Sequence, residues 1–132
     1  MSPTDFVTRA RAAAPDVIAP DGSEVRLLAA SERGSMAHFR LPAGAVSKAV
    51  AHQTVEELWY FVAGRGEMWR RRGNAEDTVT VFPGLSLSIP VGAAFQFRAG
   101  GEAALEAVGV TMPPWPGMEE AVPVPGIWEP SA

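Results

Sequence analysis

The segment from Gly44 to Gly66 constrains the fold of this 132-residue chain more than any other. Residues 58–62 form a short run of aromatic and branched side chains, which is typical of a strand buried on both faces. Gly64 and Gly66 flank a single arginine, and this pattern predicts a tight reversal into a second strand over residues 67–71. The segment therefore predicts a hairpin with a buried first strand.

The spacing of polar residues in this segment resembles the first sequence motif of the cupin superfamily. That motif has a glycine, then His-x-His, a glutamate three or four residues on, six further residues and a glycine. Glu57 matches the glutamate, since six residues separate it from Gly64, and His52 matches the second histidine. Val50 stands where the first histidine would be.

A second motif follows at the expected distance. Residues 84–92 match the cupin pattern of a glycine, five residues and Pro-x-Gly, while Phe95 replaces the last histidine of the family. Two motifs in this order resemble a small single-domain cupin, similar to the type-2 cupins, with a degenerate metal-binding motif. The resemblance implies a jelly-roll barrel over about residues 25–112.

Short strand patterns along the rest of the chain also favour an all-β fold. They are separated by glycine and proline turns, which is typical of a sandwich or a barrel. The length fits one domain over residues 1–132. Further strands are predicted over residues 25–29, 36–41, 78–82, 86–89, 95–98 and 103–111.

The two ends of the chain predict additions to the barrel. Capping side chains at the start, a small apolar stripe and Pro15 predict a helix over residues 4–14. Half of the twelve prolines lie in residues 113–132, together with large apolar side chains. We expect this tail to be an extended strap across the barrel or a neighbouring subunit, with Trp115 placed to roof the barrel mouth.

Composition bounds the partners and the compartment. The net charge of −4 does not favour nucleic acid, and the basic run at 70–72 is expected in a solvated loop. No apolar run approaches the length of a membrane span, so no membrane partner is expected. The absence of cysteine makes the cytoplasm the default location.

His52 and Glu57 can share one cavity only if the chain breaks its strand alternation between them. Positions five apart in a regular strand point to opposite faces, so residues 53–56 must form a turn or a bulge. Glu56 then faces solvent. Continued alternation places Trp59 and Phe61 on the same face as Glu57.

The resemblance also implies a metal site, because cupins with complete motifs hold a divalent metal through three histidines and the glutamate. Here only His52 and Glu57 remain, and His38 could complete a two-histidine, one-carboxylate set if it faced inward. With Val50 and Phe95 at the other two positions, we expect little or no metal. Any metal bound would be zinc, iron, manganese or nickel.

The residues favour a small-molecule-binding cupin with an apolar, aromatic-lined cavity. Arg40 and His52 would fix the polar end of the ligand, and Trp69 could add to the walls. Two alternatives stay open: a metal-dependent oxygenase or isomerase using His52 and Glu57, and a metal-free enzyme resembling sugar epimerases with His52 as base. The predicted ligand-binding set is His38, Arg40, His52, Glu57, Trp59, Phe61, Phe95 and Phe97.

The pair formed by His52 and Glu57 has two interpretations. A carboxylate beside an imidazole is expected to raise the pKa of the imidazole and to fix its tautomer, which suits a general base. The same pair could instead be a buried hydrogen bond with no catalytic role.

We also predict a homodimer, because an open barrel with an apolar tail needs protection of its sheet edges. The contact is expected to use the amino-terminal segment or the tail around Trp128. Sedimentation at micromolar concentration should give the mass of two chains, and a monomer would contradict the prediction.

Overall fold

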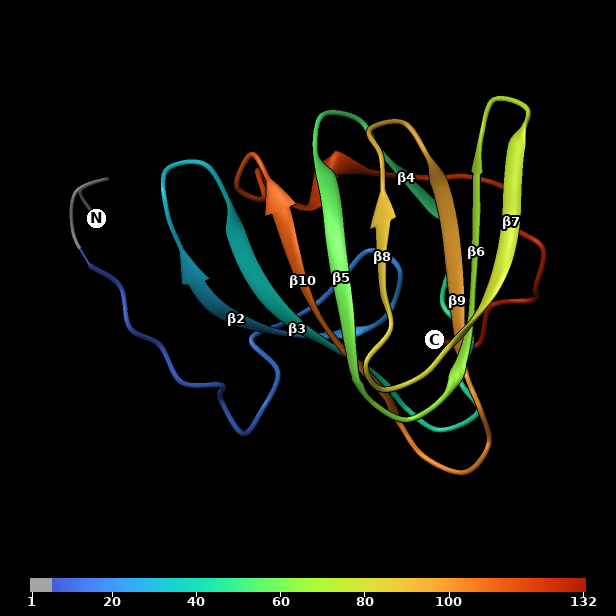
Figure 1. Ribbon diagram of the computed structural model, residues 1–132, viewed down its shortest axis with the longest axis horizontal. Helices are drawn as coiled ribbons and strands as arrows, with labels where there is room; N and C mark the ends of the chain where they lie inside the picture. The colour runs from blue at the N-terminus through green and yellow to red at the C-terminus, as the bar shows by residue number, and fades with distance from the viewer. Residues whose placement is uncertain (1–5) are drawn as a thin grey trace.

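Two antiparallel sheets face each other in the computed structural model, which describes residues 6–132 (Figure 1). One sheet has the strand order β1-β2-β3-β10-β5-β8, and the other has the order β11-β4-β9-β6-β7. The prediction of an all-β fold is confirmed. The strands are β1 (Val17–Ile18), β2 (Glu24–Ala30), β3 (Ser35–Leu41), β4 (Val50–His52), β5 (Glu56–Ala63), β6 (Gly66–Arg72), β7 (Ala75–Val81), β8 (Ser86–Ile89), β9 (Ala94–Ala99), β10 (Leu105–Met112) and β11 (Ala121–Pro123).

The core lies between the two sheets and consists mainly of aromatic and aliphatic side chains. Phe61 from one sheet and Phe95 and Phe97 from the other are each at most 2% exposed. Inward-facing residues alternate with outward-facing ones along each strand, as expected for face-to-face sheets. This packing brings the inner faces of β5 and β9 together around the barrel interior.

Strand β5 is buried on one face only, which corrects the prediction that residues 58–62 are buried on both. Trp59 and Phe61 point into the core, whereas Leu58 and Tyr60 are each 52% exposed. The cause is that β5 has the other sheet on its inner side and nothing comparable on its outer side among the described residues. The predicted alternation that grouped Glu57, Trp59 and Phe61 agrees with the structure.

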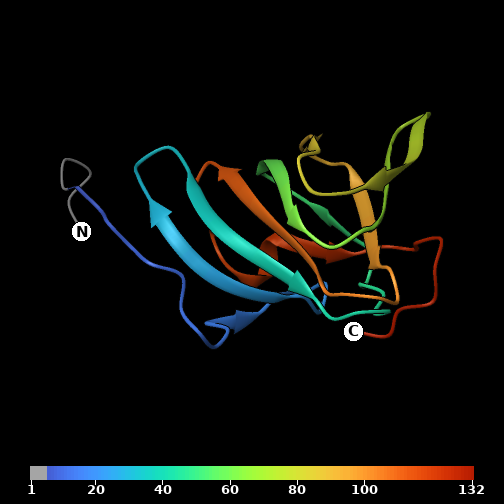
Figure 2. The ribbon, with the colours of Figure 1, turned by 60° about the horizontal axis from the view of Figure 1, so that its bottom comes forward.

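The amino-terminal segment is not helical over residues 6–14, so the predicted helix over residues 4–14 is wrong there; residues 4 and 5 lie outside the described part. Phe6 is fully exposed, and the apolar stripe therefore has nothing to pack against. Instead, the guanidinium of Arg26 donates hydrogen bonds to the carbonyls of Ala12 and Ala13, at 3.1 and 3.0 Å. Figure 2 shows this segment running outside the barrel.

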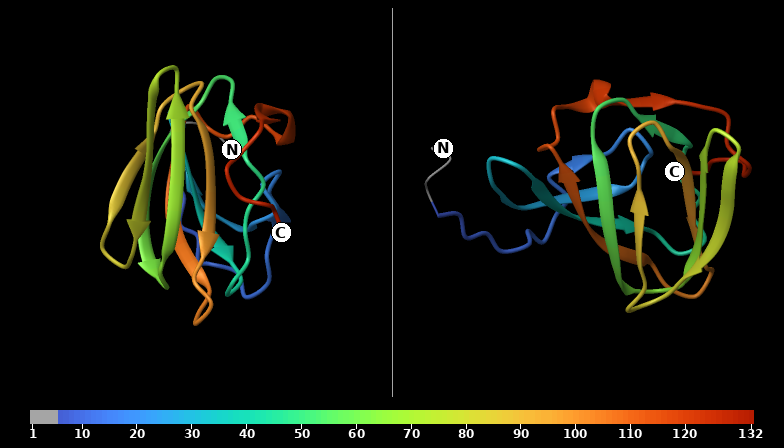
Figure 3. Two further views of the ribbon diagram at one scale, coloured as in Figure 1. Left: turned by 90° about the vertical axis from the view of Figure 1, so that its right-hand side faces the viewer. Right: turned by 45° about the horizontal axis from the view of Figure 1, so that its top comes forward.

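The tail is only partly the extended strap that was predicted. It contains a 3₁₀ turn, η1 (Met118–Glu120), followed by β11, which pairs with β4 at the edge of its sheet. Figure 3 shows the tail continuing past β4 and returning along the five-stranded sheet. There the carboxamide oxygen of Gln96 accepts hydrogen bonds from the amides of Ile127 and Trp128. Among the described residues, no helix has the length and apolar composition needed to cross a membrane.

The motif glycine after β5 is required by close approach of two backbone segments. Gly64 has a φ of 75°, and a Cβ there would lie 2.1 Å from the carbonyl oxygen of Ala104. Gly44 also has a positive φ, 73°, but its Cβ would meet no atom within 4 Å. A side chain at position 44 would therefore meet backbone strain alone, whereas a side chain at position 64 would meet both backbone strain and a steric clash.

Replacing these glycines by alanine should destabilise the fold to different extents. Gly44→Ala should cost about 1–2 kcal/mol, the penalty of a left-handed backbone. Gly64→Ala should cost more than about 3 kcal/mol, because the carbonyl of Ala104 must also move. Urea unfolding of both variants checks this, and equal losses would contradict it.

Candidate functional site

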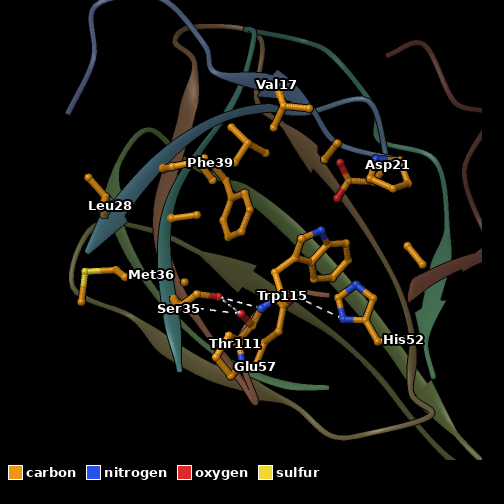
Figure 4. A pocket seen from close by; sticks show the side chains of 18 of the residues that line it. Val17, Asp21, Leu28, Ser35, Met36, Phe39, His52, Glu57, Thr111 and Trp115 are labelled. Atoms are coloured by element: carbon orange, nitrogen blue, oxygen red, sulfur yellow. Dashed lines mark hydrogen bonds and ion pairs between the residues drawn. The ribbon is translucent and has the colours of Figure 1, made fainter. Parts of the chain in front are cut away.

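A cavity of about 370 Å³ opens between the two sheets beside the strands β2 and β3 (Figure 4). Most of its wall is apolar, with a few polar groups gathered on it. The aromatic lining residues are Phe39, Trp59, Phe95 and Trp115; the polar or charged ones are Arg9, Asp21, Ser35, His52, Glu57 and Thr111.

The aromatic wall is built around Trp59. Its ring stacks on Phe39 with centroids 4.7 Å apart and an interplanar angle of 18°, and it meets Phe95 edge-on at 6.0 Å. Gly109 on β10 makes this stack possible, because a Cβ there would lie 2.5 Å from Cε2 of Phe39. The ring of Trp115 lies 5.1 Å from that of His52 and lines the pocket beside it (Figure 4).

His52 and Glu57 meet in the cavity as predicted from the motif. His52 is the last residue of β4 and Glu57 the second residue of β5. These strands belong to different sheets, so the intervening turn lets both side chains face the cavity. Nδ1 of His52 lies 3.2 Å from Oε1 of Glu57, and the indole of Trp59 donates to Oε2 of the same carboxyl. The turn is held by Glu120, whose carboxylate accepts hydrogen bonds from Thr54 and from the amide of Val55.

Burial sets the protonation of this pair. It raises the pKa of Glu57 to about 8, although the hydrogen bond from Trp59 opposes the shift. Burial also lowers the pKa of His52 to about 4, opposed by the nearby charge of Glu120. The expectation that Glu57 raises the pKa of His52 is therefore wrong. A protonated Glu57 carries no negative charge near neutrality, so only the charge of Glu120 offsets the desolvation of the imidazole.

His38 and Arg40 do not line the cavity. Strand alternation points Ala37 and Phe39 inward, so the side chains of His38 and Arg40 lie on the outer face of the sheet. There Nε2 of His38 lies 2.9 Å from a carboxylate oxygen of Glu106, and Arg40 pairs with Glu24 at 2.9 Å. The inward orientation considered for His38 is corrected by this placement.

Three of the predicted aromatic residues also lie outside the cavity wall. Phe61 and Phe97 are buried in the core without lining the cavity. Trp69 is on the opposite face of its sheet, where it packs near Trp128 and donates a hydrogen bond to Glu76 at 2.9 Å. Of the predicted ligand-binding set, the structure brings together His52, Glu57, Trp59 and Phe95.

The donor set does not fit a divalent metal. His52 and Glu57 supply two ligands, and residues 6–132 contain no cluster of three or more potential ligands from histidine, cysteine, aspartate and glutamate. Val50 and Phe95 fill the positions of the missing histidines with apolar groups. Catalytic zinc sites use three protein ligands, so a metal here would lack support from the chain.

Sequence reasoning missed several polar residues of the cavity. Asp21 lies in a D-G-S turn and is only 6% exposed; burial raises its pKa, opposed by hydrogen bonds to Oδ1 from the amide and hydroxyl of Ser23. Ser35 and Thr111 share a hydroxyl hydrogen bond of 2.5 Å, and Ser35 also accepts one from the amide of Trp115. The D-G-S pattern indicates the turn, but no sequence signal shows which way its side chain points.

Solved structures resemble this fold at low sequence identity. BH2720 from Bacillus halodurans is 20% identical, with a TM-score of 0.63, and the match covers 69% of this chain and 70% of that one. KdgF from Halomonas sp. is 16% identical, with a TM-score of 0.63 and coverages of 74% and 85%. Oxalate decarboxylase from Bacillus subtilis is 16% identical, with a TM-score of 0.68, and the match covers 81% of this chain but 29% of that longer one. No family model and no curated protein matches the sequence.

The pKa values predict how stability depends on pH. Between about pH 4.5 and 6.5, the unfolded chain carries a proton on His52 that the folded chain lacks, and the folded chain carries a proton on Glu57 that the unfolded chain lacks. The contributions of these two groups to the pH dependence of stability therefore cancel. Above pH 6.5 His52 is neutral in both states, and Glu57 should make the free energy of unfolding fall with pH, by at most about 1.4 kcal/mol per unit, until about pH 8.

Glu57→Gln should remove this contribution of Glu57 above pH 6.5, as measured by urea unfolding across the pH range. Glu56→Gln is the matched control, since Glu56 is the exposed neighbour on β5 and its replacement should leave the slope in place. Equal slopes for wild type and Glu57→Gln would show that Glu57 is ionised in the folded protein.

Proposed function

From the cupin fold that this chain shares with those structures, we propose that its barrel binds a small, largely apolar molecule. The observation that carries the proposal is the cavity of about 370 Å³ with an aromatic wall and few polar groups. Ligand pockets in proteins are typically about 300–1,000 Å³, mostly apolar, with a small number of polar groups that set orientation.

The cavity also has a polar end at which a ligand can be oriented. At neutral pH Glu57 is an uncharged acid and His52 an uncharged imidazole, as their shifted pKa values require. Nδ1 of His52 is buried without a hydrogen-bond partner among residues 6–132, although it lies 3.2 Å from Oε1 of Glu57. A ligand hydroxyl or amine can therefore bond to the imidazole without displacing a protein partner.

One structural neighbour supports binding as a use of this fold. The 11S globulin from Wrightia tinctoria has an auxin binding site; it is 18% identical, with a TM-score of 0.64, and the match covers 75% of this chain and 27% of that one. The likeness concerns the fold, so the ligand of this chain must be argued from its own cavity.

Binding can be tested with N-phenyl-1-naphthylamine, an uncharged dye that fluoresces in apolar surroundings. The wild-type protein should bind it at micromolar concentration, which corresponds to about −8 kcal/mol. Ala37→Phe places a phenyl group in the cavity wall and should weaken the affinity at least about tenfold by filling the space.

The control is Ala103→Phe, which adds the same group at an exposed loop position and should leave the dye affinity unchanged. Thermal unfolding identifies the folded variants. No dye binding by the wild type, or equal weakening by both substitutions, would contradict a ligand-binding barrel.

A further inference from the structure

We infer that the ligand of this cavity is an organic cation, a protonated amine or a quaternary ammonium group attached to an apolar body. The inference deepens the proposed function and rests on it. Three features of the cavity favour this class: its carboxyl groups, its polar atoms without protein partners and its aromatic wall.

The first feature is an excess of carboxyl groups. Asp21 and Glu57 both line the cavity and are 6% and 3% exposed. Arg9 is the one basic residue of the wall within residues 6–132; its side chain is 45% exposed, and its guanidinium lies 3.6 Å from the carboxylate of Asp16. An anionic ligand would therefore enter without a buried cation to pair with, whereas a cationic one meets two carboxyls.

The second feature is that polar atoms in the buried wall lack partners. Both hydrogen bonds to Asp21 reach Oδ1, so Oδ2 accepts none from the described residues. Figure 4 shows this carboxyl group directed into the pocket. His52 is 4% exposed, and its Nδ1 has no hydrogen bond of good geometry. Both groups can accept hydrogen bonds that the described residues do not supply, and an ammonium group supplies such donors.

The third feature is the arrangement of the aromatic rings. Trp59 stacks on Phe39 and has Phe95 against it edge-on at 6.0 Å, while the ring of Trp115 lies 5.1 Å from that of His52. Aromatic faces attract cations, most strongly those of tryptophan, and the attraction increases when the site excludes water. The apolar body of the ligand would pack on the same rings.

The competing possibility is a neutral ligand, which the aromatic wall alone would also accept. A neutral ligand adds no charge to offset the burial that raises the pKa of both carboxyls, which only Lys48 opposes electrostatically at Asp21 among the described residues. A cation offsets that cost at both positions. The two classes therefore differ in how their affinity depends on Asp21 and Glu57.

Three probes of similar size separate these classes: phenethylamine, 2-phenylethanol and phenylacetate. Isothermal titration near pH 8 keeps the amine protonated, as for a lysine side chain. The wild type should bind phenethylamine about tenfold or more tightly than 2-phenylethanol, and phenylacetate more weakly than either.

Asp21→Asn and Glu57→Gln each remove a carboxyl group that can ionise beside a bound cation, while keeping an oxygen for the bonds from Ser23 and Trp59. Each should bring the affinity ratio of amine to alcohol toward one and leave the alcohol affinity within about twofold. Glu56→Gln, on the exposed face of β5, is the control and should keep the wild-type ratio.

The outcomes distinguish this inference from the proposed function. Binding of 2-phenylethanol or the dye without a preference for the amine overturns the cation and leaves a ligand-binding barrel. An unchanged ratio in both Asp21→Asn and Glu57→Gln also overturns it. If one variant does not fold, the wild-type ratio and the other variant decide. Absence of binding by all probes and the dye contradicts both.

Discussion

The interior of this barrel depends on a carboxyl group held among aromatic rings. Glu57 is 3% exposed, and the loss of water raises its pKa so far that it enters the core as a neutral acid. Trp59 donates to it from two residues along the same strand, and His52 approaches from the facing sheet. The carboxyl thus links the two sheets through neutral contacts, which lets the surrounding wall stay apolar.

The sequence was informative wherever spacing carries a geometric requirement. The glycine and proline pattern indicated a cupin fold, and this prediction is confirmed by the structural likeness. Gly64 shows why: its backbone touches that of Ala104, so no other residue fits. Alternation along β5 correctly placed Glu57 and Trp59 on the inner face. These features follow from local periodicity and backbone sterics, which a single sequence expresses directly.

The sequence was less informative where distant segments compete for the same polar groups. Arg26 takes the carbonyls of Ala12 and Ala13, and this favours an extended amino-terminal segment over a helix. His38 pairs with Glu106, a strand neighbour far along the chain, on the side away from the cavity. The pKa of His52 depended on the protonation of Glu57, which is a property of the assembled cavity. None of these partners can be identified from spacing.

The pairing of β11 with β4 determines when the fold can be completed. Residues 50–52 find their outer neighbour only in residues 121–123, and the amides of Ser131 and Ala132 then donate to the carbonyl of Val46. During synthesis, this edge of the five-stranded sheet can therefore be completed only after residues 121–123 have been made. A nascent chain that has been synthesised through residue 112 therefore still exposes an open edge on β4.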